Sequence, residues 1–441
     1  MTGRGWFRLQ QRRFPEWFWI LLYFPVVALA SVWRTLMWRT TVIAITGSVG
    51  KSTAKECLAA ILSAHAPTVK TRDSANGRTG IPWTLLRIRP WHRFAVVEVG
   101  IDRPGVMWRS ALLVRPDVAV LLGVARTHTK SFPTLDATLR EKAKLFARLR
   151  RGGTAVLNID DPRLAALAER IPHRTVTFGG SEAADIRGSG ASSTWPKRLH
   201  FTVSAGQERR RVRTALVGDH WMPAVLGAIA AAAACNVPLE SAVAALEDVQ
   251  PFPGRMQPAP LPNGAVILRD EYNGSLETFQ AAFAVLRDAR SKRRILVISD
   301  CSDFPKSGRQ RSRYYAQVAR ECADMLIFIG ERGAYGVGRA LREGMPAGAV
   351  HAFYDLQEAA GFLRRELREG DLVLLRGRTE HHLSRLYFEQ LGSVQCRKHR
   401  CPLRFVCDRC PELGFEPDPS LAQAALDDAG QLPAPTRRRN G

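Results

Sequence analysis

Acidic residues are scarce in this sequence. Asp and Glu number 41 against 64 Lys and Arg among 441 residues, so the formal net charge is +23. An excess of this size favours anionic partners, namely nucleotides, nucleic acid or an acidic membrane surface, without choosing among them. A bias of genome composition towards arginine is an equally good explanation of the charge.

Cysteines and internal repeats are also few. Eight cysteines in a chain of this length exclude a small disulfide scaffold, and no internal repeat stands out. Hydrophobic residues make 46% and charged residues 24%, which is ordinary for globular proteins and excludes a disordered chain or a fibre. The length suggests about two to three domains with large cores.

An apolar stretch near the N-terminus points to a membrane. Residues 17–33 carry no charged side chain, and arginines precede and follow them. As a helix they span roughly 25 Å, which is marginal for a bilayer core, and their Trp and Tyr side chains suit its interface. Pro25 would kink a helix or turn a re-entrant hairpin.

We therefore predict a membrane anchor over residues 1–40, held at the cytoplasmic face of the inner membrane. A single span, a hairpin and an interfacial helix all stay open. A cleaved signal peptide and an apolar helix packed on a soluble body are the alternatives.

The rest of the chain alternates apolar runs with helical periods. Residues 42–47, 94–100 and 117–124 are continuous apolar runs, typical of strands in parallel sheets. The alternation predicts an α/β domain. Short alternating runs predict β-hairpins over 174–217, and an Ala-rich helix follows over 223–248.

A proline cluster, PFPGRMQPAPLPNG, marks a domain boundary. Strands and helices alternate again beyond it and predict a second, doubly wound α/β domain. We place the first domain at 41–258, the second at 259–393, a Cys-rich segment at 394–415 and a disordered tail at 416–441.

A phosphate-binding loop follows the first predicted strand. Its glycines and the N-terminus of the next helix would direct backbone N–H groups at phosphates. Lys51 would reach the β- and γ-phosphates, and the Ser52 hydroxyl would ligate Mg²⁺. The spacing Gly-x-x-Gly-Lys-Ser is shorter than that of GTPases and kinases. The loop comprises Thr46, Gly47, Ser48, Val49, Gly50, Lys51, Ser52 and Thr53.

The sequence TGSVGKST resembles the nucleotide loop of the ATP-dependent Mur ligases. The chain is most similar to the UDP-N-acetylmuramoyl-tripeptide:D-alanyl-D-alanine ligases, and the likeness covers roughly residues 42–385. Further segments match in order: SANGRTGIPWTLL, VVEVGIDRPGVM, RTHTKSFPTLDATLREKAKLF, LNIDDP, VGDHW, PFPGRM, RDEYNG and GDLVLLRG.

The resemblance implies a P-loop central domain followed by a Rossmann-like C-terminal ligase domain. It also implies amide ligation: ATP phosphorylates a carboxylate, and an amine then attacks the acyl phosphate. Lys51 would hold the phosphates, Ser52 and Glu98 would ligate one Mg²⁺, and His128 would ligate a second. Lys142 stands where the family carries a carbamoylated lysine, although an exposed helical lysine is the alternative.

Further ATP contacts are implied for Asn158 and Asp270 at the nucleoside and for Arg255 at the phosphates. The alternative interpretation of Arg255 is an ordinary solvated arginine. Glu98 gains independent support, because a lone carboxylate in a buried strand is costly without a partner.

The chain also departs from the family pattern. The family's N-terminal UDP-binding domain is not recognisable in the first 40 residues. Several expected side chains are replaced; the replacements are Gly123, Trp221, Ala224, Arg269, Arg376 and Thr379. We interpret this as retained ATP chemistry with altered substrates.

The predicted function is an ATP-dependent amide ligase for cell-wall or envelope polymer synthesis. Its substrates would be a carboxylate, lipid-linked or polymeric, and the amine of an amino acid or peptide. A non-catalytic nucleotide-binding scaffold in envelope assembly is the alternative. A nucleic-acid partner is disfavoured, because no pattern of interleaved aromatic and basic residues supports it.

Four cysteines cluster in CRKHRCPLRFVCDRC. Thiolates suit tetrahedral Zn²⁺, and the neighbouring cations would offset their charge. We predict a structural Zn²⁺ site; an iron–sulfur cluster and unliganded thiols are the alternatives. The residues are Cys396, Cys401, Cys407 and Cys410.

Overall fold

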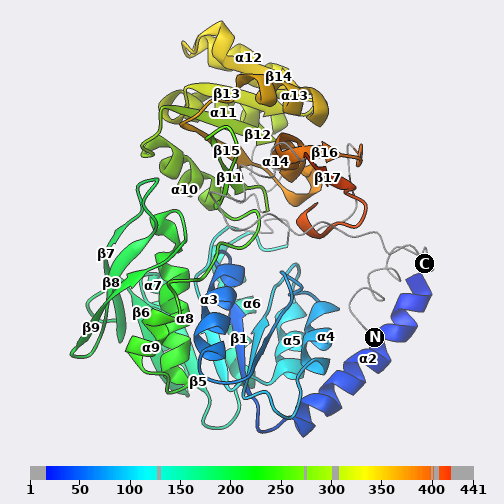
Figure 1. Cartoon of the computed structure of the whole chain (residues 1–441). Coiled ribbons are helices and arrows are strands. Elements are labelled where there is room, and N and C mark those ends of the chain that lie inside the picture. The colour runs from blue at the N-terminus through cyan, green and yellow to red at the C-terminus, as the bar shows by residue number, and fades with distance from the viewer. Residues whose placement is uncertain are drawn as a thin grey trace.

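The computed structural model shows two α/β domains, the first below the second in Figure 1. The residues that it describes are 16–126, 131–272, 276–299, 307–398, 401 and 407–418. The predicted α/β fold of a central and a C-terminal domain is confirmed.

The first domain is built on a nine-stranded sheet in the order β2-β3-β1-β4-β5-β6-β7-β8-β9. The strands from β2 to β7 in this order run parallel, and β8 and β9 continue the sheet as antiparallel strands. The hairpins predicted over 174–217 therefore begin at β7, whereas β6 pairs in parallel with β5 and β7. The strands are β1 Thr41–Thr46, β2 Thr68–Lys70, β3 Phe94–Glu98, β4 Val118–Leu121, β5 Thr154–Asn158, β6 Arg174–Gly179, β7 Ile186–Ser192, β8 His200–Ala205 and β9 Glu208–Arg213.

Helices cover both faces of this sheet, which explains its continuous apolar strands. In β1, Ile43 and Ile45 pack in the cluster that contains α3 and α8, whereas Val42 and Ala44 face the cluster of α4 and α5. The helices are α3 Lys51–Ser63, α4 Gly80–Leu86, α5 Val106–Val114, α6 Leu135–Ala143, α7 Pro162–Ala168, α8 Met222–Ala234 and α9 Leu239–Ala244, with 3₁₀ turns η1 Phe146–Arg148 and η2 Asp219–Trp221.

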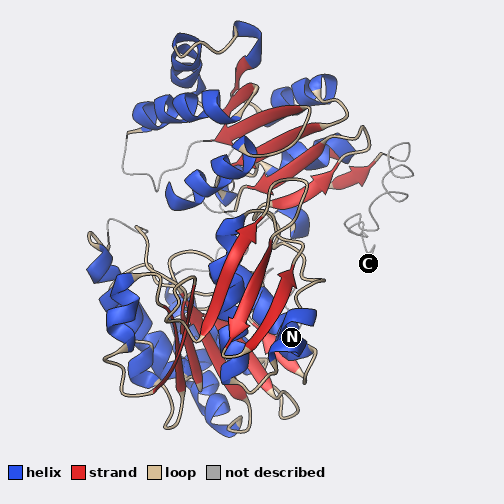
Figure 2. Cartoon of the chain, turned by 90° about the vertical axis from the view of Figure 1, so that its left-hand side faces the viewer, coloured by secondary structure: helices blue, strands red, loops and turns tan. Residues whose placement is uncertain are grey.

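The second domain has a six-stranded sheet in the order β10-β11-β15-β12-β13-β14, parallel except at β10. Figure 2 shows the two sheets from the side, with helices packed against each. Its elements are β10 Gln257–Pro260, β11 Val266–Asp270, α10 Leu276–Arg287, β12 Arg293–Ser299, α11 Gly308–Cys322, β13 Met325–Ile329, α12 Gly333–Arg342, η3 Ala347–Ala349, β14 Val350–Phe353, α13 Leu356–Glu366, β15 Asp371–Arg376, η4 Thr379–His381 and α14 Ser384–Leu391.

A small antiparallel pair follows α14. Strand β16 Gly392–Val394 pairs with β17 Phe415–Pro417, and the 3₁₀ turn η5 Cys407–Arg409 lies between them in sequence. Residues 416 and 417, which the sequence assigned to a disordered tail, are therefore strand, because β16 supplies their partner. Asp418 follows the strand and donates its N–H to Leu391 O at 2.9 Å, and residues 419–441 of that predicted tail lie outside the described residues.

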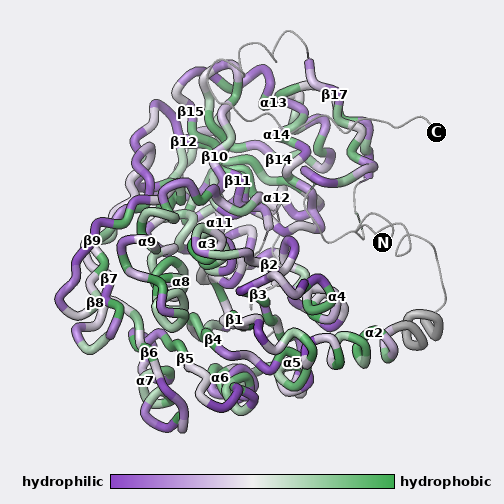
Figure 3. Tube along the Cα trace, turned by 60° about the horizontal axis from the view of Figure 1, so that its bottom comes forward, coloured by the Kyte–Doolittle hydropathy of each residue, from purple (hydrophilic) through white to green (hydrophobic). Residues whose placement is uncertain are grey.

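Helix α2, Glu16–Leu36, lies along α4 and α5 on the outside of the first domain (Figure 3). It passes through Pro25 as one helix, so the hairpin alternative is wrong for this segment. Arg34, expected to flank a membrane segment, is buried; it donates to Val114 O at 2.8 Å and pairs with Asp117 at 3.1 Å. Within the described part of the chain, no helix is both long and apolar enough to span a bilayer.

Candidate functional site

The phosphate loop lies between the carboxyl end of β1 and the first turn of α3. Gly50 caps α3 with φ 83°, in the left-handed region that favours glycine. A Cβ at this position would lie 3.2 Å from Ala224 Cβ of α8. The loop backbone is thus held close to α8, and the free N–H groups of α3 form an anion-binding end.

Two lysines meet at one carbonyl of this loop. Lys51 Nζ donates to Gly47 O at 2.8 Å, and Lys142 Nζ, from α6, donates to the same oxygen at 2.9 Å. Burial lowers the pKa of Lys142 well below its ordinary value, and the Lys51 ammonium lowers it further. Burial also lowers the pKa of Lys51, against the attraction of Glu98. The exposed-lysine interpretation of Lys142 is therefore wrong, since its side chain is only 2% exposed.

Glu98 ends β3 directly beside the loop and is 1% exposed. Its Oε1 accepts from Asn76 Nδ2 at 2.6 Å and from Ser52 Oγ at 3.2 Å. Its Oε2 accepts no hydrogen bond from the described residues and lies 3.9 Å from Lys55 Nζ. One carboxylate oxygen thus stays available next to Ser52.

The linker between the domains brings Arg255 over the loop. Its Nη2 lies 3.4 Å from Ser52 Oγ, and its guanidinium carbon lies 4.7 Å from the centre of the Tyr272 ring. The Arg255 Nε, also buried, makes no hydrogen bond among the described residues. The solvated-arginine alternative is wrong, because this side chain is stacked and directed into the site.

The two nucleoside candidates have structural partners. Asn158 Nδ2 donates to Leu122 O at 3.1 Å and so joins the ends of β4 and β5. Asp270, buried at the end of β11, accepts from Met256 N at 3.2 Å and pairs with Arg376. Burial raises the pKa of Asp270, against the attraction of Arg376. Both side chains are therefore occupied in this structure, and their contact with a nucleoside stays a prediction.

The predicted second metal ligand, His128, lies outside the described residues. The structure brings together the other phosphate and metal candidates: Lys51, Ser52, Glu98, Lys142 and Arg255.

Three further residues complete this cluster and were not assigned from the sequence. Asn76 donates to the Glu98 carboxylate, and the Ser74 hydroxyl lies 2.7 Å from the Ser52 hydroxyl. Lys55 is fully buried and donates to Thr71 O at 3.1 Å. Asn76 and Ser74 stood in the matched segment SANGRTG, so that segment was the available signal.

The residues present fit ATP with Mg²⁺. Three buried polar atoms of residues in or beside the loop have no hydrogen-bond partner in the described chain: Thr46 Oγ1, Glu98 Oε2 and Arg255 Nε. Carboxylate and hydroxyl oxygens are ligands that Mg²⁺ prefers, and the guanidinium suits a phosphate. The His220 and Trp221 rings, 4.6 Å apart, lie at η2 just before α8, and each has a buried nitrogen without a partner in the same residues.

Comparison with known proteins agrees with this geometry. The family described as "Mur ligase middle domain" matches residues 45–232, and "Mur ligase, glutamate ligase domain" matches 254–379. The UDP-N-acetylmuramoyl-tripeptide–D-alanyl-D-alanine ligase of Mycobacterium tuberculosis is 28% identical over 357 residues, covering 76% of this chain and 70% of the relative. The Escherichia coli ligase of the same name is 29% identical over 308 residues, 67% of each chain.

Solved structures show the same fold. A crystal structure of MurF from Acinetobacter baumannii has a TM-score of 0.77 and 26% identity, covering 83% of this chain and 80% of that one. The MurF ligase from Thermotoga maritima in complex with ADP has a TM-score of 0.72 at 21% identity, with 83% of both chains covered.

Proposed function

The chain belongs to the Mur ligase family, and from this premise we propose how its site joins a carboxylate to an amine. It is an ATP-dependent amide-forming ligase of cell-wall synthesis, as its relatives are. The observation that carries the detailed proposal is the convergence of Lys51, Lys142, Ser52 and Glu98 on one loop.

The reaction has two chemical steps. A carboxylate oxygen attacks the γ-phosphorus of ATP, and the bond from that phosphorus to the β–γ bridging oxygen breaks, releasing ADP. An amine then attacks the acyl carbon, phosphate leaves, and the nitrogen loses a proton. Lys51, Arg255 and the N–H groups of α3 hold the phosphate oxygens, where positive charge lowers the barrier most.

Ser52 and Glu98 would hold one Mg²⁺, with Asn76 fixing the carboxylate, and His128 would hold a second. When bound, Mg²⁺ neutralises the charge on the transferred phosphoryl group. Asn158 and Asp270 are proposed at the nucleoside.

Lys142 is proposed as a carbamate in the working enzyme. Because burial and Lys51 lower the pKa of Lys142, its neutral amine is favoured, and only a neutral amine can add to CO₂. The addition releases one proton and gives an anionic carbamate oxygen, which the nearby Lys51 ammonium would attract.

We test the ligase proposal by ADP release from the full chain with Mg-ATP. Membrane lipid extract and soluble acids, including the UDP-muramoyl-tripeptide of the relatives, are offered with D-alanyl-D-alanine and other amines. Release that needs both an acid and an amine, and that Lys51→Ala and Lys142→Ala abolish, is expected. ATP binding without turnover on every pair would favour the nucleotide-binding scaffold instead.

A membrane surface is proposed to hold the acceptor, which would then be lipid-linked or polymeric. One stripe of α2 packs on the domain, while Phe24, Leu29, Val32 and Leu36 on its other side are 57–67% exposed. Exposed apolar side chains on a helix with nearby arginines suit an interfacial position rather than a span. Trp38 continues this surface with Arg39 at 4.9 Å from its ring.

Flotation with vesicles checks this attachment. The protein should float with phosphatidylglycerol vesicles and less with phosphatidylcholine vesicles. A Leu29→Ser, Val32→Ser double variant should stay at the bottom. Tyr354→Ser, at a residue 59% exposed in the second domain, should float like the parent; equal flotation of all three proteins would refute attachment through α2.

We also propose a structural Zn²⁺ ion at the cysteine cluster. It would stabilise this part of the fold and take no part in the reaction.

A further inference from the structure

The segment that follows α14 has very little core of its own. It contributes β16, β17 and η5, with Val394, Cys407 and Leu413 as its buried apolar residues. Two strands of three residues each bury too little surface to hold a fixed shape unaided, and segments of this size are usually held by a metal ion or by disulfides. Cys396, Cys401, Cys407 and Cys410 are all free thiols.

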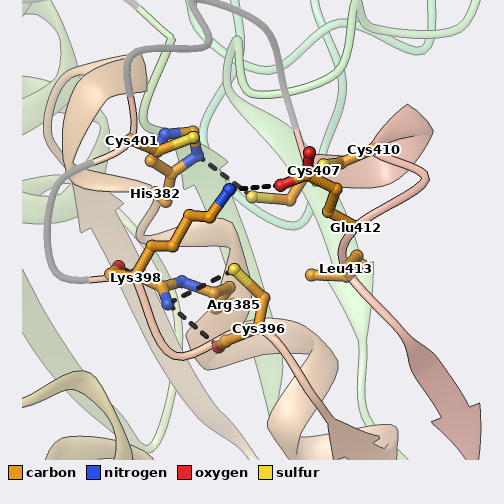
Figure 4. Close-up of a pocket in the computed structure, with 9 residues that line it drawn as sticks. All are labelled: His382, Arg385, Cys396, Lys398, Cys401, Cys407, Cys410, Glu412 and Leu413. Carbon is orange, nitrogen blue, oxygen red and sulfur yellow. Dashed lines mark hydrogen bonds and ion pairs between the residues drawn. The ribbon is translucent and has the colours of Figure 1, made fainter. Parts of the chain in front are cut away.

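These four thiols line a single cavity with a volume of about 10 Å³, together with His382 from the turn before α14 (Figure 4). That space corresponds to about one water-sized sphere. It therefore suits a single ion and is too small for an organic ligand.

The polar groups around the cavity suit an anionic metal–thiolate centre. Arg385 Nη1 lies 4.0 Å from Cys396 Sγ and 3.1 Å from Cys396 O. His382 is 5% exposed, its Nδ1 lies 3.1 Å from Cys407 Sγ, and its Nε2 has no hydrogen-bond partner in the described chain. An imidazole held against a ligating sulfur in this way orients the ligand.

The thiols are not gathered around one point in this conformation. No three Cys, His, Asp or Glu side chains of the described ranges are arranged as ligands of one ion. Figure 4 shows the Lys398 amine among the cysteine side chains, where it pairs with Glu412. Lys398 is 47% exposed, so it can swing outwards as the thiols close.

We propose that Cys396, Cys401, Cys407 and Cys410 bind one Zn²⁺ ion and that this ion fixes η5 as a brace against β11 of the second domain. Four thiols release four protons to solvent as four Zn–S bonds form, which leaves a centre of net charge −2. His382 Nδ1–H donates to the Cys407 sulfur, and Arg385 and the displaced Lys398 offset the charge.

The bracing contacts come from the two residues between the last pair of cysteines. Asp408 accepts two hydrogen bonds from Arg269, at 2.6 and 2.7 Å, and Arg269 is 1% exposed and also bonded to Glu271. Arg409 pairs with Asp73 of the first domain, next to the residue that bonds Ser52.

Arg269 is one of the side chains that departs from the family pattern, and the brace explains it. A buried guanidinium needs carboxylate partners, and Asp408 of the cysteine segment supplies one of the two. Asp408 of η5, the turn that the metal would hold, thus neutralises Arg269 of β11, which directly precedes Asp270.

Metal content of the full chain tests the site without reference to ligase activity. About one zinc per chain is expected in the parent and in Cys235→Ser, a matched thiol outside the cluster, and less than about 0.2 in Cys401→Ser and Cys410→Ser. Cobalt substitution of the parent should give thiolate-to-metal charge transfer and the visible bands of a tetrahedral site. Reconstituted parent protein of native circular dichroism without stoichiometric zinc, or with iron and sulfide, would overturn the proposal.

Hydrogen exchange tests the brace separately. Removing zinc with a chelator should raise exchange in β11 as well as in η5. Asp408→Asn should retain zinc yet raise exchange in β11. If zinc loss changes exchange only within the cysteine segment, the metal site stands alone and the brace is refuted.

Discussion

Replacing Lys142 with methionine is expected to abolish turnover without loss of stability. The amine makes one hydrogen bond, to Gly47 O, and such a bond stabilises a fold by about 1 kcal/mol net. Burial of the amine and the charge of Lys51 act against this stabilisation, because both lower the pKa of Lys142. Each unit by which the pKa is lowered destabilises the ammonium form by about 1.4 kcal/mol. Methionine has a similar volume, so the free energy of unfolding should change by less than about 1 kcal/mol.

Turnover should fall at least about 100-fold, or roughly 3 kcal/mol, the effect of removing one group aligned with the transition-state charge. ADP release measures turnover and urea denaturation measures stability. Arg140→Met, on the exposed side of the same helix, likewise replaces a basic side chain with methionine and should behave like the parent. A carbamate carbon signal from ¹³C-bicarbonate should appear in the parent and not in Lys142→Met. A variant that keeps turnover within about threefold would refute the role of this side chain.

Glu98→Gln keeps the side-chain shape and removes the charge, so ADP release should fall about 100-fold and its apparent Mg²⁺ requirement should rise; an unchanged Mg²⁺ dependence would exclude Glu98 as a ligand. Gly50→Ala should destabilise the fold by about 1–2 kcal/mol, because φ is 83°, and should also weaken ATP binding through the contact with Ala224. Gly105→Ala is the matched control, because Gly105 has φ 81° but a Cβ there would meet open space. If Gly105→Ala also lowers the affinity for ATP, the contact with Ala224 does not explain the effect of Gly50→Ala. Burial, with Arg376 nearby, lowers the pKa of His220 to about 4. His220 therefore stays neutral in the folded chain at pH 5, whereas in the unfolded chain it binds a proton below about pH 6.5. The free energy of unfolding should therefore fall by roughly 2 kcal/mol from this group between pH 7 and pH 5, and His220→Phe should remove that share in urea titrations at the two pH values.

The sequence by itself determined the repeating order of strands and helices, the phosphate loop and the family. These features are local: an apolar run forms a buried strand, and Gly-Lys-Ser-Thr at a helix start forms an anion site, whatever surrounds them. Glu98 could also be predicted, because a lone carboxylate in an apolar strand needs a partner.

The partners of charged side chains were decided only by the tertiary structure. Lys142 and Gly47 are 95 residues apart, and Arg269 and Asp408 are 139 apart. Arg34, which the sequence suggested as a flanking cation of an apolar segment, is 80 residues from the Val114 carbonyl to which it donates. A charge can be buried only where a partner satisfies it, and the fold alone determines which distant segment supplies that partner.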